Sequence, residues 1–314
     1  MSQLLDICSA ALEKSRKDSN MKETALVMAF DEGYAECSLV ALHSALKRCS
    51  IILPVVCVVP RGFPVRIKKA FTGVATASNT DVEFIEAGSF FDGVESKIPH
   101  ISTPTFYRLQ FPELLTEFRE CIYLDGDTLV LDDIASLIRI SMGNSYLLGV
   151  KAPYWSSASL NRKLEMALKS VRDRTLISGL HYSKYINAGV LRMNLEAMRK
   201  VGIVKKFQEY MHLGLNDQDI LNKCCHRHIG FIAPRYNLMT KYLEEDAEGS
   251  YKWARDDIGR SYTSFEMREA LDNPCIVHFA DKDKPWNSDS VPFGDKWKKE
   301  RAALNRALQV SIDG

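Results

Sequence analysis

The sequence predicts an α/β fold in which helices cover both faces of a parallel sheet. From residue 24 to residue 124, apolar runs of strand length alternate with helical stripes of apolar residues. The runs are apolar at consecutive positions, which is typical of strands that are buried on both faces. Apolar residues form 46% of the 314-residue chain and charged residues 26%, so the protein has enough apolar side chains for a large core.

Each element follows from its own pattern of apolar residues. Apolar runs predict strands at residues 24–30, 55–59, 82–85, 121–124, 185–193 and 273–279. Apolar positions three and four apart predict helices at residues 4–12, 35–49, 64–77, 104–115, 195–210, 217–225 and 296–314. We expect Pro112 to break the fourth of these helices and Asn194 to cap the fifth. Residues 236–268 are polar and weakly periodic, which predicts loops and short helices.

Composition excludes several classes of protein. The 41 Lys and Arg residues against 40 Asp and Glu give a net charge of +1, which argues against a protein that coats nucleic acid. Mean hydropathy is −0.16, and no apolar run approaches the ~20 residues of a membrane span. Asp6 and Glu13 interrupt the N-terminal segment, which argues against a secretory signal. The eight cysteines include no CxxC pair, so we expect free thiols, a cytoplasmic protein and no structural zinc.

We divide the chain into three parts. Residues 1–22 are expected to form an N-terminal helical extension, residues 23–290 one α/β domain, and residues 291–314 a basic C-terminal helix. The last part carries Trp297 and five Lys or Arg residues. It is either an ordinary solvated helix or a helix that rests on an anionic membrane with its tryptophan at the interface.

Two aspartates directly follow the strand predicted at residues 121–124. Asp125 and Asp127 stand at i and i+2, and such side chains point to the same side of an extended chain. Gly126 between them allows a tight turn and leaves room for a ligand. Ligands bind beyond the carboxyl ends of strands in open α/β sheets. The pair can therefore hold one cation, although a plain Asp-Gly turn has the same sequence.

A histidine far along the chain is expected at a similar place. His278 lies at the end of an apolar run, so it too should emerge at the carboxyl end of a strand. Its imidazole either is a satisfied core residue or completes an Asp–Asp–His site for a divalent ion such as manganese. Lys284 follows closely and offers a compact positive charge for a phosphate.

Three further segments carry polar residues at the ends or in the middle of apolar elements. Asn187 interrupts the strand of residues 185–193, and its amide can donate and accept, as recognition of sugar hydroxyls requires. Gly189 in the same strand also fits a bulge. Residues 216–219, Asn-Asp-Gln-Asp, fit a helix N-terminus with an N-cap and acids in the first turn. Asp31 follows the first strand, where many α/β folds bind nucleotides, but GxGxxG and GxxxxGK[ST] motifs are absent.

Together, the order and spacing of these features resemble the family 8 retaining glycosyltransferases, which include bacterial lipopolysaccharide galactosyl- and glucosyltransferases and glycogenin. The resemblance covers residues 24–290. The segments that carry it are MAFDEGYA (28–35), FYRL (106–109), YLDGDTLV (123–130), YINAGVLRMNL (185–195), NDQDILN (216–222), VHF (277–279) and KPW (284–286). The resemblance implies a Rossmann-like glycosyltransferase-A fold, a UDP-sugar donor and a requirement for Mn²⁺, or for Mg²⁺ in its place.

The resemblance also implies a role for each matching residue. The metal ligands of the family correspond to Asp125, Asp127 and His278. Its uridine and diphosphate contacts correspond to Ala29, Asp31, Tyr34 and Lys284, with Gly126 lining the donor site. Its donor-sugar contacts and residues at the reacting sugar correspond to Arg108, Asn187, Ala188, Gly189, Asp217 and Gln218. The implied acceptor is a glycan or a lipid-linked glycan, at the inner face of a membrane if the C-terminal helix binds there.

The chemistry favours one of two routes to retention. Glycosyl transfer passes through an oxocarbenium-like state while the UDP oxygen gathers negative charge. A divalent cation and Lys284 would stabilise that leaving group. Retaining hydrolases use a second carboxylate as nucleophile, but Gln218 occupies the analogous position here, and an amide is a poor nucleophile. We therefore expect front-face transfer, in which a UDP phosphate oxygen takes the acceptor proton and Gln218 orients the sugar.

Three departures from the family pattern bear on the donor. Asp281 stands where the family usually has glycine, and Gly33 replaces a residue that is often asparagine. Residues 148–153 lack an aspartate that some members use against the outer hydroxyls of the sugar, so glucose and galactose are equal candidates. The alternatives are a degenerate homologue that binds UDP or a glycan without turnover, and a nucleotidyltransferase. The latter would need a glycine-rich phosphate loop that residues 28–35 do not provide.

Overall fold

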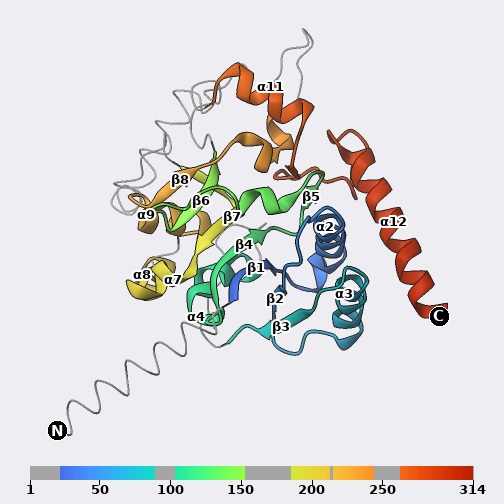
Figure 1. Ribbon diagram of the computed structural model, residues 1–314, viewed down its shortest axis with the longest axis horizontal. Helices are drawn as coiled ribbons and strands as arrows, with labels where there is room; N and C mark the ends of the chain where they lie inside the picture. The colour runs from blue at the N-terminus through green and yellow to red at the C-terminus, as the bar shows by residue number, and fades with distance from the viewer. Residues whose placement is uncertain (1–21, 89–102, 153–184, 213–214, 244–261, 314) are drawn as a thin grey trace, which may run out of the picture.

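The computed structural model describes residues 22–88, 103–152, 185–212, 215–243 and 262–313. The helix predicted at residues 4–12 lies outside the described residues, as does most of the polar stretch of residues 236–268. Within the described part of the chain, strands and helices alternate in the first half, and helices flank a central sheet (Figure 1). The predicted α/β class is therefore confirmed.

The central sheet has seven strands in the order β3-β2-β1-β4-β7-β6-β8. Its strands in chain order are β1 (Lys22–Ala29), β2 (Val55–Val59), β3 (Val82–Glu86), β4 (Phe118–Leu124), β6 (Leu147–Lys151), β7 (Ile186–Asn194) and β8 (Ile229–Phe231). Strand β7 runs antiparallel to both of its neighbours, β4 and β6, whereas the other pairs in this sheet are parallel. The sheet is therefore mainly parallel, with a reversal beside β4.

A second, smaller sheet lies at the end of β4. It consists of β5 (Thr128–Val130), β10 (Ile276–His278) and β9 (Leu238–Met239), with β10 between the other two. Strand β10 is antiparallel to β5 and parallel to β9. Residues 273–279 were predicted as a strand, but β5 and β9 were not, because two or three residues are too few to show a period.

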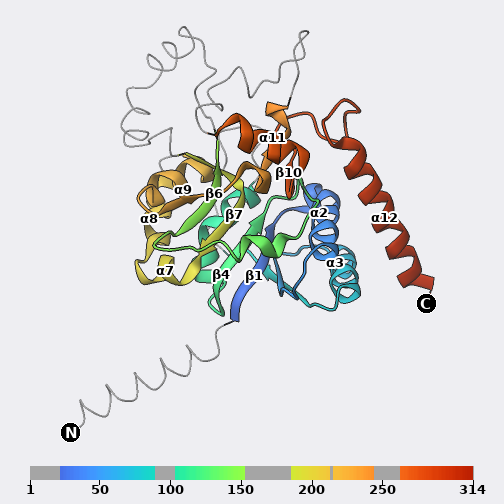
Figure 2. The ribbon, with the colours of Figure 1, turned by 45° about the horizontal axis from the view of Figure 1, so that its top comes forward.

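The sheet separates two apolar cores, and β1 contributes to both. Leu26 and Met28 face one core, and Ala25 and Val27 face the other. The helices on the first side are α2 (Ala35–Lys47), α3 (Val65–Ala77), α11 (Ser264–Asp272) and α12 (Gly294–Asp313). Those on the second side are α4 (Phe111–Leu114), α7 (Leu195–Lys200), α8 (Ile203–His212) and α9 (Asp217–Cys225). Figures 1 and 2 show the two groups of helices on opposite sides of the strands. Burial on both sides explains the continuous apolar run of β1.

Two predicted helices differ from the structure. Residues 195–210 form two helices rather than one, because Gly202 between α7 and α8 adopts a positive φ of 59°. The predicted cap is confirmed, since Asn194 accepts a hydrogen bond from the Ala197 N–H. In the segment predicted as helix 104–115, residues Thr103–Gln110 form a 3-10 helix that leads into α4. Pro112 lies in the first turn of α4, where its missing N–H costs no hydrogen bond, so it begins a helix instead of breaking one.

Helix α12 packs against α2 and α3 through buried residues. Trp297 is 1% exposed, and its ring centroid lies 5.3 Å from that of Trp286. The alternative that places this tryptophan at a membrane interface is therefore wrong, because the ring belongs to the core. Glu300 is also buried and pairs with Arg48 at 2.8 Å and with His43 at 2.8 Å.

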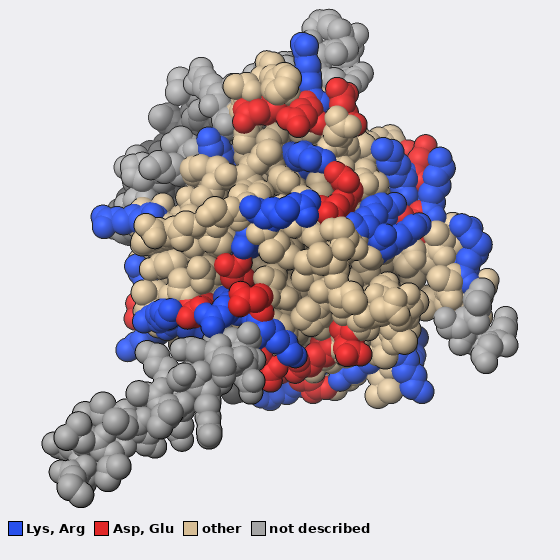
Figure 3. Space-filling view, viewed as in Figure 1, with Lys and Arg blue, Asp and Glu red and all other residues tan. Residues whose placement is uncertain are grey.

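The outer face of the molecule carries both signs of charge. On the face in Figure 3, patches of Lys and Arg lie next to patches of Asp and Glu, with broad uncharged areas between them. The exposed side of α12 carries Lys296, Lys299 and Arg306. Among the described residues, no helix combines the length and the hydrophobicity that crossing a bilayer requires.

Candidate active site

Three potential metal ligands converge where the two sheets meet. Asp125 follows β4, Asp127 precedes β5 and His278 ends β10, and their ligand atoms all lie within 4.8 Å of one another. His278 Nε2 is 3.2 Å from Asp127 Oδ1 and 3.8 Å from Asp125 Oδ2. Strand pairing explains the convergence, because His278 lies opposite Thr128 and the Phe279 N–H donates to the Asp127 carbonyl at 2.9 Å. Two carboxylates and an imidazole form a ligand set that can bind a divalent metal ion.

Gly189 makes room for this cluster. A methyl group at this position would overlap His278 Cε1 and would lie 2.8 Å from Asp125 Oδ2. The Gly189 carbonyl also accepts a hydrogen bond from the Asp125 N–H at 2.8 Å. Gly126 is equally crowded, because a Cβ there would overlap Ser38 of α2. Both glycines thus allow close packing of the protein's own side chains around the aspartates.

Lys284 lies directly against the second aspartate. Its Nζ donates to Asp127 Oδ2 and to the Phe279 carbonyl, each at 2.5 Å. Burial of Asp127 would raise its pKa, but the neighbouring His278 and Lys284 outweigh burial and hold that pKa well below the ordinary value. Asp127 is therefore a carboxylate throughout the physiological range and can serve as a metal ligand.

Arg108 joins four parts of the site. Its Nη2 donates to Asp125 Oδ1 at 2.8 Å, and its Nη1 donates to the Ala188 carbonyl at 2.5 Å. Its Nε lies 3.2 Å from Asp217 Oδ2, and its guanidinium carbon lies 4.3 Å from the centroid of the Tyr123 ring. Burial alone would lower the pKa of Arg108, but the two aspartates raise it overall, so the guanidinium stays charged.

Asp217 and Gln218 open α9 and face the site from the other side. The side chain of Asn216 caps the helix by accepting from the Asp219 N–H at 2.7 Å, as its sequence predicted. Asp217 is only 3% exposed, and burial raises its pKa to about 6 in spite of the Arg108 charge beside it. Gln218 is held by hydrogen bonds on both ends of its amide.

Those bonds belong to a network of side chains around Asn187. Gln218 Oε1 accepts from Asn187 Nδ2 and from the Ala188 N–H, each at 3.0 Å. Gln218 Nε2 donates to the Tyr185 hydroxyl at 3.2 Å, and that hydroxyl donates to Asp219 Oδ1 at 2.6 Å. The amide of Asn187, which the sequence suggested for sugar hydroxyls, is therefore largely engaged within the protein.

The residues expected at the nucleotide lie beside the aspartates at the end of β1. Strands β1 and β4 pair, so Ala29, the last residue of β1, lies near Asp125, which directly follows β4. Asp31 accepts a hydrogen bond from the Tyr34 N–H at 3.1 Å and so caps the short helix Glu32–Tyr34. The Tyr34 ring stands edge-on to that of Trp286, with 6.3 Å between the centroids. Burial and the nearby Asp127 charge raise the pKa of Tyr34, so its hydroxyl remains a hydrogen-bond donor.

Two of the three departures have local explanations. The Asp281 carboxylate accepts from the Lys282 N–H at 2.7 Å and so turns back onto its own loop. At Gly33 an added Cβ would lie 3.3 Å from Asp31 Oδ1, so little space separates this position from the cap. Of residues 148–153, only 148–152 lie among the described residues.

The sequence did not identify several side chains that support the site. Tyr123 donates to Asp125 Oδ1 at 2.5 Å, and Asn222 bonds the backbone of Ile186 at 2.8 and 2.9 Å. Asn237 donates to Asn187 Oδ1 at 2.8 Å. Tyr123 and Asn222 lie inside two segments that carry the family resemblance, YLDGDTLV and NDQDILN, but roles were predicted only for other residues of those segments. Asn237 lies in a polar stretch without any pattern, and only the pairing of β9 with β10 brings it here.

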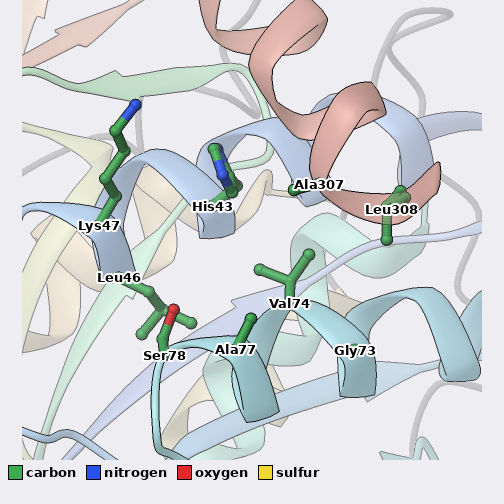
Figure 4. A pocket seen from close by; sticks show the side chains of 9 residues that line it. All are labelled: His43, Leu46, Lys47, Gly73, Val74, Ala77, Ser78, Ala307 and Leu308. Carbon is green, nitrogen blue, oxygen red and sulfur yellow. The ribbon is translucent and has the colours of Figure 1, made fainter. Parts of the chain in front are cut away.

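A hollow away from the candidate metal site lies between α2, α3 and α12. It has a volume of about 330 Å³, and Figure 4 shows apolar side chains such as Val74 and Leu308 along it, with His43 and Lys47 at one end. Its lining comes from the second half of α2, whereas Ser38 in the first half is the part that approaches Gly126. The metal-ligand cluster and this hollow are therefore separate.

Comparison with known proteins defines the family. The profile of Glycosyl transferase family 8 matches residues 25–290. General stress protein A of Bacillus subtilis (strain 168) is 28% identical over 242 residues, which cover 73% of this chain and 76% of that protein. The galactosyltransferase LgtC, solved with donor and acceptor sugar analogues, has a TM-score of 0.70 and 22% identity, with 89% of this chain and 96% of LgtC covered.

A third comparison extends the likeness in fold. The apo structure of the bifunctional glycosyltransferase WbbM has a TM-score of 0.71 and 21% identity, with 92% of this chain and 51% of WbbM covered. This chain therefore spans about half of WbbM. These two likenesses confirm the expected glycosyltransferase-A fold. Since the family profile covers most of the sequence, the protein belongs to glycosyl transferase family 8.

Proposed function

We propose that this protein is a metal-dependent, retaining glycosyltransferase that moves a hexose, glucose or galactose, from a UDP-sugar to a glycan acceptor. The observation that carries the proposal is the convergence of Asp125, Asp127 and His278 within 4.8 Å, beside the Lys284 ammonium. A divalent cation held by these ligands, Mn²⁺ or Mg²⁺, supplies Lewis-acid stabilisation of the leaving diphosphate. The likeness in fold to LgtC, which was solved with donor and acceptor sugar analogues, supports a sugar donor and a sugar acceptor.

In this proposal each end of the donor meets residues already described. Ala29, Asp31 and Tyr34 bind the uridine, and Lys284 turns from Asp127 towards the diphosphate. Arg108 holds Asp125 and the Ala188 carbonyl in fixed positions at 2.8 and 2.5 Å, which favours a rigid site for the sugar. Gly126 and Gly189 allow close packing around the metal ligands. Asp217 and Gln218 stand at the reacting sugar.

The hydrogen bonds of Gln218 favour front-face transfer. Its Oε1 already accepts two hydrogen bonds, at 3.0 Å from Asn187 Nδ2 and 3.0 Å from the Ala188 N–H. An amide oxygen with both lone pairs engaged is a poor nucleophile. We therefore infer that the acceptor oxygen bonds to the anomeric carbon on the side from which UDP leaves. The carbon–oxygen bond to UDP breaks, and a UDP phosphate oxygen takes the acceptor proton. The second Nε2 hydrogen of Gln218 then donates to the sugar.

The alternative is a homologue that binds UDP or a glycan without turnover. The specific observations in its favour are Asp281 and Gly33, the two departures nearest the donor. Two contacts favour the enzyme. The Asp281 carboxylate accepts from the Lys282 N–H, and Lys284 pairs with Asp127 and not with Asp281.

Release of UDP from a panel of UDP-sugars separates the two functions. We expect hydrolysis or transfer from one donor that requires Mn²⁺ and is lost on chelation. Asp127→Asn should abolish it, whereas Asp289→Asn, at a side chain that is 98% exposed, should not. Absence of release together with tight UDP binding would support the binding protein. Absence of both would overturn both functions. The anomeric configuration of the product, read by NMR, tests retention.

We also propose that the domain of residues 23–290 carries the reaction while α12 holds the protein against the cytoplasmic face of a membrane. The exposed Lys296, Lys299 and Arg306 support this proposal, because basic helices bind anionic lipid headgroups. A lipid-linked glycan would then be within reach as the acceptor. The protein should co-sediment with phosphatidylglycerol vesicles, and Lys296→Glu/Lys299→Glu should remove that binding. Equal recovery with neutral and anionic vesicles would contradict it.

A further inference from the structure

A row of buried amides joins Gln218 to the histidine of the metal-ligand cluster. Asn187 Nδ2 donates to Gln218 Oε1 at 3.0 Å, and Asn237 Nδ2 donates to Asn187 Oδ1 at 2.8 Å. Asn237 Oδ1 then lies 2.9 Å from His278 Nδ1. Asn187, Asn237 and His278 are 8%, 1% and 3% exposed, so water does not compete for these bonds. Each amide therefore has a fixed set of partners.

One backbone N–H fixes the direction of every bond in this row. The Gly189 N–H can only donate, and it lies 2.9 Å from a terminal atom of Asn187, which must therefore be the carbonyl oxygen Oδ1. The same oxygen accepts from Asn237, so the atom that Asn237 presents to Asn187 is its NH₂ group. The other terminal atom of Asn237, which faces His278, is then an oxygen and an acceptor.

It follows that His278 Nδ1 carries a hydrogen and donates it to Asn237. A neutral imidazole has one N–H, so its Nε2 is left with a lone pair. That nitrogen is the one that faces the carboxylates, at 3.2 Å from Asp127 and 3.8 Å from Asp125. A metal ion can be bound only by an imidazole nitrogen without a hydrogen, and an acceptor on the opposite nitrogen fixes the ring and increases its basicity.

We propose that Asn237 is a positioning residue, which sets the tautomer of His278 for metal binding and ties this ligand to Gln218. The inference rests on the proposed metal site. It gives a role to Asn237, for which the polar sequence of residues 236–268 predicted none. Asn237 reaches this place because β9, which begins at the next residue, pairs with β10. The acceptor for Nδ1 thus comes from the strand beside the histidine.

The two hydrogen bonds of Asn237 can be separated by substitution. Asn237→Ala removes both, and we expect Mn²⁺ affinity, measured by the EPR signal of free Mn²⁺, to fall about 10–100-fold. Asn237→Asp keeps an acceptor for Nδ1 but cannot donate to Asn187, so it should bind Mn²⁺ about as well as the wild type while UDP release slows. Asn194→Ala is the matched control, because it removes another side-chain amide, which caps α7 at the far end of β7 and does not contact His278. Its Mn²⁺ affinity should be unchanged.

The tautomer has a readout that needs no turnover. In protein labelled with ¹⁵N-histidine, one of the seven imidazoles should show an Nδ1–H that exchanges slowly with water and disappears in His278→Asn. In Asn237→Ala this proton should exchange faster. A folded wild type in which His278 carries its hydrogen on Nε2 alone would overturn the inference. Wild-type Mn²⁺ affinity in folded Asn237→Ala would overturn it as well.

These measurements distinguish failure of the inference from failure of the proposed function. If the wild type binds no Mn²⁺, the proposed metal-dependent reaction is contradicted. The Nδ1–H signal of His278 still shows whether Asn237 sets the tautomer. If Asn237→Ala does not fold, the Asn237→Asp variant and the wild-type spectrum decide it. An Asn237→Asp variant that folds but loses Mn²⁺ affinity about 10–100-fold would contradict the role of the acceptor.

Discussion

The guanidinium of Arg108 lies 3.2 Å from the Asp217 carboxylate, and both side chains are buried. Arg108 precedes β4 and also holds Asp125, whereas Asp217 is the first residue of α9. The pair therefore connects the helix that carries Gln218 to the loop that carries two of the three candidate metal ligands. Because both side chains are buried, water has little access to these two charges. The geometry of the site therefore depends on their contact.

Replacing Arg108 by Lys should damage both activity and stability. Lysine keeps the positive charge but lacks the planar fork that reaches Asp125, Asp217 and the Ala188 carbonyl together. We expect UDP release to fall by about 100-fold or more and the free energy of unfolding by about 2–4 kcal/mol. Initial rates and urea denaturation measure the two effects. A variant with wild-type stability would show that the guanidinium contacts contribute nothing to the fold.

Asp217 should make stability depend on pH between about 4 and 6. Burial raises its pKa from 3.8 to about 6, with Asp125 and Asp219 adding to the rise and Arg108 opposing it. In that range the folded state binds more protons than the unfolded state, so this residue's contribution falls as pH rises through the folded pKa and levels off only above about pH 7.

Urea denaturation of the wild type and Asp217→Asn at pH 4, 5, 6 and 7 tests this prediction. The free energy of unfolding of the wild type, relative to the variant, should fall by about 1–3 kcal/mol between pH 4 and pH 6. Parallel curves would mean that the carboxyl group titrates alike in both states.

Gly189→Ala should weaken metal binding. The added methyl group would overlap His278 and would crowd Asp125 at 2.8 Å, so both ligands must move. We expect Mn²⁺ affinity to fall about 10–100-fold, by titration with the EPR signal of free Mn²⁺. Gly73→Ala on α3 is the control, because no atom lies within 4 Å of its added Cβ, and alanine should stabilise that helix by about 0.5–1 kcal/mol. Equal Mn²⁺ affinity in the two variants would contradict the crowding argument.

Glu300→Gln should loosen α12 from α2. Burial would raise the pKa of Glu300, but hydrogen bonds from His43 and Arg48 lower it to about 2. Its contribution is therefore complete above pH 4.5 and is lost as pH falls towards 2. We expect the free energy of unfolding at pH 7 to drop by about 1–3 kcal/mol.

Chemical denaturation at pH 7 and pH 3 measures the Glu300 effect, which should shrink at the lower pH. Asp289→Asn removes an ion pair to Lys298 at a fully exposed site, where solvent screens the charges, and should leave stability essentially unchanged. A similarly unchanged stability in Glu300→Gln would show that its ion pairs do not hold the helix.

The parts of the fold that could be predicted are those whose pattern is set by burial. β2 lies at residues 55–59, as predicted, because all five residues are buried and β-branched residues dominate it. The strands β5 and β9 could not be predicted, because they exist only through pairing with β10. The division at Gly202 was missed, because the apolar spacing continues through it while the backbone does not.

The candidate site shows the same division. Asp125, Asp127 and His278 could be predicted to converge for two reasons. Ligands bind beyond the carboxyl ends of strands in α/β sheets, and the segments around these residues resemble the family motifs. The role of Asn237 could not be predicted, since it depends on a hydrogen-bond direction that is set by Gly189 in another strand. Neither alternative offered for the C-terminal helix, a solvated helix or a membrane-bound one, placed Trp297 in the core, because helical spacing does not say which side faces α2.

The pairing of β5 with β10 also determines when the site can exist during synthesis. Asp125 and Asp127 leave the ribosome early, together with the strands of the central sheet, but their partners His278 and Lys284 are made near the end. Until then β5 lacks its neighbour, and the two carboxylates lack both the His278 imidazole and the positive charge of Lys284. A nascent chain that stops before residue 276 therefore carries every strand of the central sheet but only two of the three candidate metal ligands. Cation capture would mark the final step of folding and could not guide the earlier ones.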